Sequence, residues 1–142
     1  MTQIKHVVSK LIKKHKTNDP YEITSQKNII IQYEQLGSVL GYHNTYRRIQ
    51  FIHINSELED YKKRFVCAHE LGHALLHPNV NTPFLRKNTF YAISKIEREA
   101  NEFAVELLLE DKAIKEHSTV QEAAVLYGIP KELIYLKKKR GI

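Results

Sequence analysis

Apolar residues recur at the three- and four-residue spacing of a helix face in several stretches of this 142-residue chain. The stretch 3–16 has this spacing and ends before Pro20, a residue that cannot continue a helix. Ser56, with Glu59 three residues later, has the spacing of a capping box and predicts a helix start. Thr119 with Glu122 repeats that spacing. The predicted helices are 3–16, a short one at 21–26, 56–77, 94–110, and two short helices after Thr119 around the Gly128-Ile129-Pro130 turn.

Three runs between the first helices have the character of strands. Residues 28–33 are rich in β-branched side chains, residues 37–43 are interrupted by glycine, and residues 47–55 alternate between two faces. Residues 42–46 are interpreted as the hairpin loop between the second and third runs. The pattern predicts an α+β fold with a small three-stranded sheet, antiparallel or mixed, packed on helices.

Length and composition favour one compact domain with a small addition, and we predict a main domain over 1–116 and a helical subdomain over 117–142. No apolar run approaches the roughly 20 residues that span a bilayer. Residues 1–6 lack the apolar segment of a signal peptide, and the single cysteine, Cys67, excludes an internal disulfide. A cytoplasmic protein without membrane contact is expected.

The formal net charge of +6 admits an acidic or nucleic-acid partner without establishing one. Much of the excess lies near the two ends of the chain and is interpreted as solvated surface. These residues are Lys10, Lys13, Lys14, Lys16, Lys137, Lys138, Lys139 and Arg140.

The strongest chemical signal is His69-Glu70-Leu71-Gly72-His73. Residues four apart lie on one face of a helix, so two imidazoles at that spacing can bind one zinc ion. The intervening Glu70 would lie beside the metal, where it can accept a proton from water. The surrounding residues are largely apolar, which predicts a buried, rigid helix. We predict zinc bound by His69 and His73, with Glu70 as the catalytic acid and base.

A catalytic zinc site needs a third protein ligand, and the helix 94–110 offers two neighbouring candidates, Glu97 and Glu99. At about 100° per residue, Glu97 shares a face with the apolar residues, which predicts that it points inward as the third ligand. Asn101, one turn later on that face, is predicted to hydrogen-bond a ligand. The opposite face is predicted to be solvated and carries Glu99, Glu102, Glu106 and Glu110.

Other side chains capable of chemistry are interpreted differently. His77 continues the row of His69 and His73 and is the competing third ligand, but successive four-residue steps drift by about 40° and do not converge on one ion. Asn79 stands where the metzincin pattern has its third histidine. Tyr91, in a predicted loop over 78–91, is a candidate for stabilising an oxyanion. The remaining candidates are assigned to packing or surface positions: Cys67, His43, His53 and His117.

The run from Arg64 to His77, followed by Glu97-x-x-Ala100-Asn101-x-Phe103-Ala104, resembles the ImmA/IrrE family of metallopeptidases. That resemblance covers nearly the whole chain and implies a zincin-like fold of the glutamate-zincin type. It implies His69, His73 and Glu97 as zinc ligands. It also implies a substrate that is a DNA-binding helix-turn-helix repressor encoded nearby on a prophage or mobile element.

We therefore predict a zinc endopeptidase that cuts a protein partner. The strand 49–55 is proposed as an exposed edge that pairs with an extended substrate segment. The alternative is a regulator without protease activity that docks on the repressor, or on DNA, through its helical tail. Direct nucleic-acid binding is not expected, because two short helices are a weak signal for it.

Overall fold

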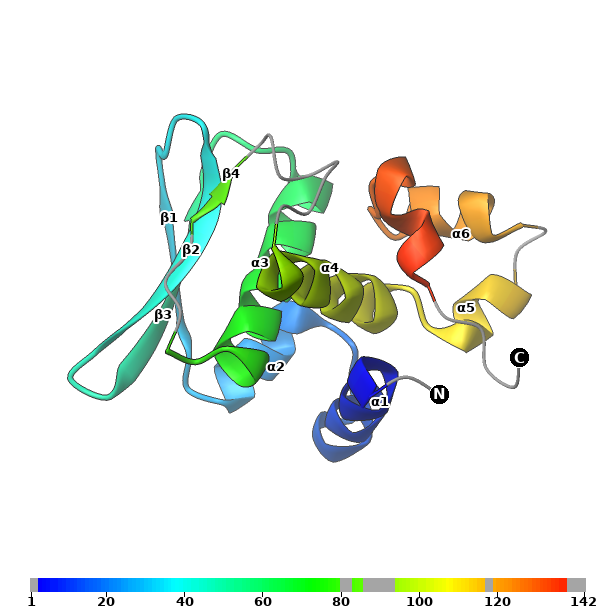
Figure 1. Ribbon diagram of the computed structural model, residues 1–142, viewed down its shortest axis with the longest axis horizontal. Helices are drawn as coiled ribbons and strands as arrows, with labels where there is room; N and C mark the ends of the chain where they lie inside the picture. The colour runs from blue at the N-terminus through cyan, green and yellow to red at the C-terminus, as the bar shows by residue number, and fades with distance from the viewer. Residues whose placement is uncertain (1–2, 80–82, 86–93, 117–118, 138–142) are drawn as a thin grey trace.

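The computed structural model describes residues 3–79, 83–85, 94–116 and 119–137 of the chain. The predicted α+β class is confirmed: a small sheet lies on one side and several helices pack beside it (Figure 1). The helices are α1 (Gln3–His15), α2 (Pro20–Gln26), α3 (Asp60–Leu76), α4 (Lys95–Leu108), α5 (Asp111–Lys115), α6 (Val120–Leu126) and the 3₁₀ helix η2 (Lys131–Leu136). The strands are β1 (Ile30–Glu34), β2 (Val39–Tyr46), β3 (Ile49–Asn55) and β4 (Phe84–Leu85).

The sheet has the order β1-β3-β2-β4 and is mixed. β1 is parallel to β3, and β2 is antiparallel to both β3 and β4. All three predicted strands are present, and β4 is a short addition inside the region predicted as a loop. The prediction that strand 49–55 is an exposed edge is wrong, because β3 lies between β1 and β2. Sequence alternation identifies the buried face of a strand but says nothing about its neighbours in the sheet.

The hairpin between β2 and β3 differs from the prediction. Residues 42–46 are not a loop, since β2 continues through Tyr46. The turn consists of Arg47 and Arg48, which both have positive φ angles, 51° and 68°. Two such residues form the type of turn whose twist matches that of the strands. Such turns are usually recognised in a sequence by Asn-Gly or Asp-Gly. Arginine rarely adopts this backbone conformation, so the sequence Arg47-Arg48 did not indicate the turn.

Helix α3 also starts later than the capping-box spacing predicts. Its N-terminal flanking residue is Glu59, and Ser56 does not cap it. The turn between β3 and α3 is stabilised by Asn55 instead. Its Oδ1 accepts from Glu57 N–H, and its Nδ2 donates to the carbonyls of Gly37 and Val39. The end of β3 is therefore bonded to the loop before β2, and α3 begins after this turn. In contrast, Thr119 caps α6, as predicted, and Ser94 caps α4.

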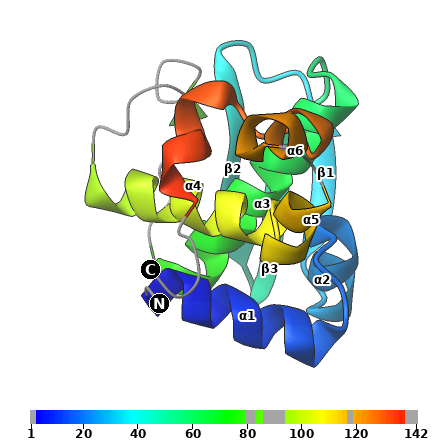
Figure 2. The ribbon, with the colours of Figure 1, turned by 90° about the vertical axis from the view of Figure 1, so that its right-hand side faces the viewer.

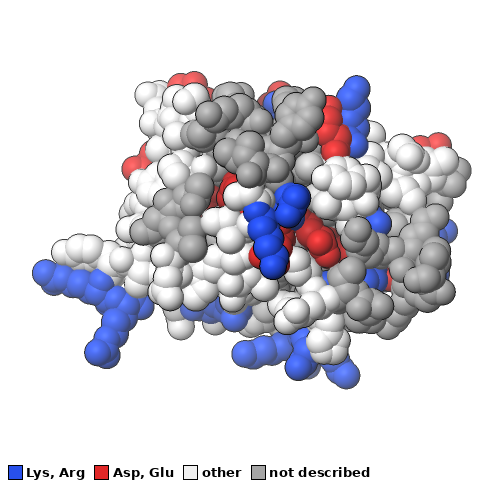
Figure 3. Space-filling view, viewed as in Figure 1, with Lys and Arg blue, Asp and Glu red and all other residues white. Residues whose placement is uncertain are grey.

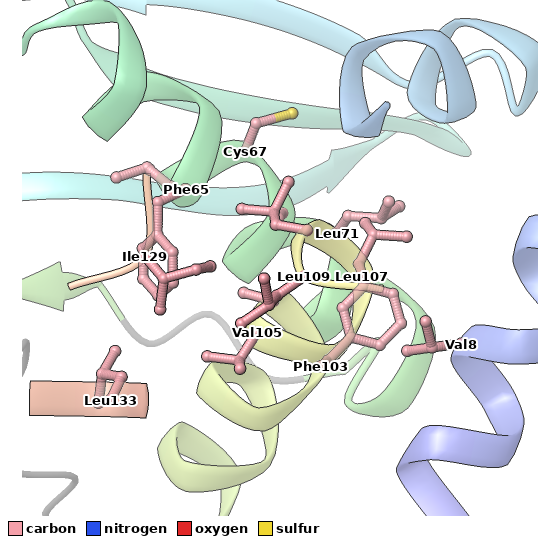
Figure 4. Packing of buried hydrophobic residues seen from close by; sticks show 14 of the residues in the cluster. Val8, Phe65, Cys67, Leu71, Phe103, Val105, Leu107, Leu109, Ile129 and Leu133 are labelled. Carbon is pink, nitrogen blue, oxygen red and sulfur yellow. The ribbon is translucent and has the colours of Figure 1, made fainter. Parts of the chain in front are cut away.

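Helix α3 lies between the sheet and α4, and this layer forms the core (Figures 1 and 4). The sheet contributes Ile52 and Ile54, which are fully buried. On the other side, Gly72 lets α4 approach closely, because a Cβ added at Gly72 would lie 3.0 Å from the ring of Phe103. Figure 4 shows Leu71 of α3 and Val8 of α1 on either side of α4. The metal-motif helix is thus held on both sides by packed layers.

The C-terminal tail packs against α4 on the side opposite α1 (Figure 2). Ile129 and Leu133 bury their side chains in the same core cluster. Two short helices around Gly128 are present, but the second, η2, is a 3₁₀ helix rather than an α-helix. A six-residue 3₁₀ helix is short for a recognition helix that reads a DNA groove, which weakens the DNA-binding form of the alternative prediction.

Of the basic residues predicted to be solvated, Lys10, Lys13, Lys14 and Lys16 are exposed, whereas the side chain of Lys137 is only 3% exposed. Figure 3 shows lysine and arginine side chains projecting from the outer end of the β2–β3 hairpin and along the edge where α1 lies. Among the described residues, none of the helices combines the length and apolar character needed to cross a membrane.

Glu106 contradicts the prediction of a solvated glutamate row on α4. It is only 3% exposed, although it lies on the face opposite Glu97. Helix α1 and the tail cover this end of α4, and each contributes a lysine. Lys5 and Lys137 lie 3.3 and 2.7 Å from Glu106 Oε1, and 3.0 and 3.1 Å from Asp111 Oδ1. Helix phase predicts which way a side chain points, but not which distant segments cover it.

Replacing Glu106 with glutamine is expected to destabilise the protein by about 3 kcal/mol, because both buried lysines lose a carboxylate partner. Chemical denaturation of the purified protein measures this change. The exposed Glu57→Gln is the matched control and should change stability by less than about 0.5 kcal/mol. Equal effects of the two substitutions would show that the buried cluster adds no stability.

Candidate metal centre

Helices α3 and α4 bring the three predicted ligands together. His69 and His73 lie one turn apart on α3, and Glu97 lies in the first turn of α4, directly after the Ser94 cap. One potential ligand atom from each side chain lies within 4.8 Å of the other two. All three side chains are almost completely buried. The structure thus places His69, His73 and Glu97 in one cluster, as the helix phase predicts.

The protonation states in this cluster suit metal ligands. Glu97 Oε1 lies 2.6 Å from His73 Nε2, and Glu97 Oε2 lies 3.6 Å from His69 Nε2. Burial alone would raise the pKa of Glu97, but its interactions with His69 and His73 outweigh burial and lower that pKa to about 2. Burial lowers the pKa of His73, although Glu97 opposes this shift. An ionised carboxylate beside neutral imidazole is the combination that binds a divalent cation.

Asn101 occupies the position predicted for it, one turn after Glu97. Its Oδ1 lies 2.8 Å from His69 Nδ1. Because an amide oxygen only accepts hydrogen bonds, Nδ1 of His69 carries the proton, and the lone pair is on Nε2. Nε2 is buried and has no hydrogen-bond partner in the described structure. The contact fixes both the tautomer and the ring orientation of His69.

His77 and Glu99, the rejected alternatives, pair with one another outside the cluster. His77 Nε2 lies 2.9 Å from Glu99 Oε1, and His77 Nδ1 lies 3.1 Å from His73 Nδ1. His77 is not among the residues whose ligand atoms converge. In this arrangement His77 contacts the back of His73, on the ring side away from Glu97.

Glu70 lies beside the cluster without joining it. The side chain is fully buried, and both carboxylate oxygens are without a hydrogen-bond partner in the described structure. A buried carboxylate that lacks partners is strongly unfavourable. Such a group in a folded protein is a candidate for contact with a ligand, water or substrate.

Two residues near the site were not singled out from the sequence. The ring of Phe84 in β4 stacks on His69, with ring centroids 3.7 Å apart and an angle of 6° between the planes. His43 of β2, which was assigned to packing or surface, is buried, and its Nδ1 lies 3.5 Å from Glu70 Oε1. Neither residue belongs to a recognisable motif.

The remaining candidates behave as follows. Cys67 is a fully buried free thiol, as predicted, and burial raises its pKa far above the usual range, so it stays protonated. His53 is a packing residue: it bonds Glu34 and Asn44 and stacks on Tyr42. Tyr91 and His117 lie outside the described residues.

The residues present fit a metal ion. Two imidazole nitrogens and a carboxylate are the donor set typical of catalytic zinc sites with an open position. The buried, unpartnered His69 Nε2 and Glu97 Oε2 are the atoms that such an ion would satisfy. The fold and the cluster thus define an α+β protein with a candidate metal centre between two helices.

Comparisons with known proteins place this centre in a family. The family described as the IrrE N-terminal-like domain matches residues 24–137. The chain is 45% identical over 141 residues to uncharacterized immunity region protein 2 of Bacillus phage phi105, covering 96% of this chain and 89% of that protein. It is 40% identical over 115 residues to metallopeptidase ImmA of Bacillus subtilis strain 168, covering 80% and 67%. The chain therefore belongs to the ImmA/IrrE family of metallopeptidases, which confirms the resemblance predicted from its motifs.

Proposed function

We propose that this protein is a zinc-dependent endopeptidase of the glutamate-zincin type that cuts a protein partner, most specifically a DNA-binding repressor. The observation that carries the proposal is the buried Glu70 carboxylate, unpartnered among the described residues and placed beside three converging ligand atoms. A purely structural metal site has no use for such a group, because it costs stability without holding the ion.

His69, His73 and Glu97 would hold the zinc ion, and Asn101 would orient His69. When bound, zinc would act as a Lewis acid that polarises the peptide carbonyl and lowers the pKa of an attacking water. In the reaction, a carboxylate oxygen of Glu70 accepts a proton from that water. Glu70 then delivers the proton to the departing amide nitrogen.

The substrate would bind in an extended form along the outer edge of β2. β3 pairs with one edge of β2, and on the other edge β4 pairs only with Val39 and Gly41, so no described strand covers that other edge from Tyr42 to Tyr46. This segment includes His43, which reaches the site next to Glu70. A peptide strand added here would run past the metal centre. The corrected edge is thus β2, and not β3.

A neighbouring apolar cleft of about 430 Å³ offers room for a substrate side chain. Its wall includes Phe65 and Val66 of α3 and also Phe84, whose ring stacks on that of His69. The tail contributes Gly128 and Pro130 to the same cleft. An apolar residue near the scissile bond therefore suits this site.

The repressor is proposed as substrate from the family resemblance and from the name of one relative, an immunity region protein of phage phi105. Cleavage at an extended segment requires a locally unfolded stretch of the partner, and a linker between two repressor domains meets this need. A cytoplasmic location follows from such a partner.

The test is to express the protein together with the repressor encoded beside it and to look for a discrete cleavage product by mass spectrometry. Cleavage by the wild type that is absent with Glu70→Gln supports the endopeptidase. A repressor that is inactivated but intact would favour the docking regulator instead. The observation behind that alternative is the exposure of three apolar tail residues, Val125 (76%), Leu126 (67%) and Tyr135 (66%).

A further inference from the structure

His43 and Glu70 are two buried polar groups that face each other. His43 is 1% exposed, and Glu70 is 0% exposed. Neither ring nitrogen of His43 and neither oxygen of Glu70 has a hydrogen-bond partner in the described structure. Nearly all buried polar side chains in native proteins are hydrogen-bonded. Four unpartnered atoms in two adjacent side chains therefore require an explanation.

The backbone of β2 holds His43 against α3. Gly41 and His43 are two residues apart on the strand and so point to the same face. At Gly41 the strand lies so close to α3 that an added Cβ would fall 2.5 Å from Val66 Cγ1 and 3.7 Å from Glu70 Cγ. The ring of His43 also stacks on that of His73, with centroids 5.8 Å apart and 17° between the planes. These contacts leave the imidazole little freedom to turn away.

The distance between the two groups is close to that of a hydrogen bond. His43 Nδ1 lies 3.5 Å from Glu70 Oε1, while an N–H···O bond is typically about 2.9 Å long. A shift of a few tenths of an ångström in the Glu70 side chain closes this gap. Neither His43 nor Glu70 belongs to the converging ligand set, so this shift moves none of the three predicted metal ligands.

We propose that His43 is a positioning residue for Glu70, an inference that rests on the proposed peptidase function. Nδ1–H of His43 donates to Oε1 of Glu70 and holds the carboxylate in one orientation. The second oxygen, Oε2, then faces the reacting water and moves the proton. Without His43 the carboxylate can rotate, and fewer encounters with water are productive.

A double-mutant cycle tests the pairing without any cleavage assay. The metal-free wild type, His43→Leu, Glu70→Ala and the double variant are compared by their thermal unfolding midpoints, because alanine, unlike glutamine, removes the acceptor oxygen. His43→Leu should lower Tm by about 4 °C more in the presence of Glu70 than in the Glu70→Ala background, since neighbouring polar groups are coupled. Equal shifts in both backgrounds would overturn the proposal. His53→Leu is the matched control: it removes another buried histidine, but its bonds go to Glu34 and Asn44, so its shift should be the same in both backgrounds.

The second measurement asks whether the pairing matters for the reaction. For zinc-loaded protein acting on the repressor, His43→Leu should lower kcat about 10-fold or more with KM and zinc content unchanged. His43→Asn, which keeps an N–H donor near the place of Nδ1, should restore most of this loss. Equal loss in both variants, or loss of zinc, would contradict a positioning role. If Glu70→Gln itself cut normally, the peptidase proposal would fail, while the unfolding cycle would still report on the pair.

Discussion

Replacing Glu97 with alanine is expected to abolish stoichiometric zinc binding, whereas Glu99→Ala should leave it intact. Glu97 supplies one of three converging ligand atoms. Its low pKa, about 2, keeps the carboxylate ionised at neutral pH. Loss of a group that only supports a ligand already weakens metal binding by about 10–100-fold, so loss of a ligand should exceed about 100-fold.

Glu99 is a matched control because it lies two residues away on the same helix and is also a glutamate. Its carboxylate accepts from His77 and does not reach the cluster. Zinc content after dialysis, together with calorimetric titration of the metal-free protein, measures the difference. Circular dichroism checks that both variants are folded. Zinc retained by Glu97→Ala and lost by Glu99→Ala would refute the assignment made from helix phase.

The sequence could predict that Glu97, and not Glu99, points toward the core, because this depends on the geometry of one helix alone. At about 100° per residue, the side chain that shares the face of Ala100 and Ala104 must point toward the core. The histidine spacing on α3 is local in the same way. The site residues on helices were therefore accessible from the sequence, and the structure places them together.

Features that depend on distant segments were not predictable in this way. Glu106 points away from the site as expected, but α1 and the tail bury it, and neither segment is near it in the sequence. His43 reaches Glu70 because β2 passes over α3, and this depends on strand order. The central position of β3, between β1 and β2, also depends on how distant segments pair. Local periodicity reports orientation, while the partners of each face are set by the tertiary arrangement.

Replacing Glu70 with glutamine is expected to reduce repressor cleavage by about 10²–10⁴-fold, the usual contribution of a general acid and base. Glutamine has nearly the same shape but cannot accept and return the proton. Zinc content should stay the same, because Glu70 does not belong to the converging ligand set. Product formation over time, followed by mass spectrometry, measures the loss. The exposed Glu57→Gln is the control and should cut at the wild-type rate.

Glu70→Gln is expected to lower the cleavage rate but not the stability of the protein. The Glu70 carboxylate is buried without a hydrogen-bond partner in the described structure, and His43 Nδ1 lies 3.5 Å from its Oε1. A neutral amide is less costly to bury than a charged carboxylate. The metal-free Glu70→Gln protein should therefore unfold at the same or a higher temperature than the wild type. Loss of cleavage together with retained zinc and undiminished stability would identify Glu70 as a group kept for chemistry at the expense of stability. A variant that both unfolds earlier and loses zinc would instead show that Glu70 supports the site structurally.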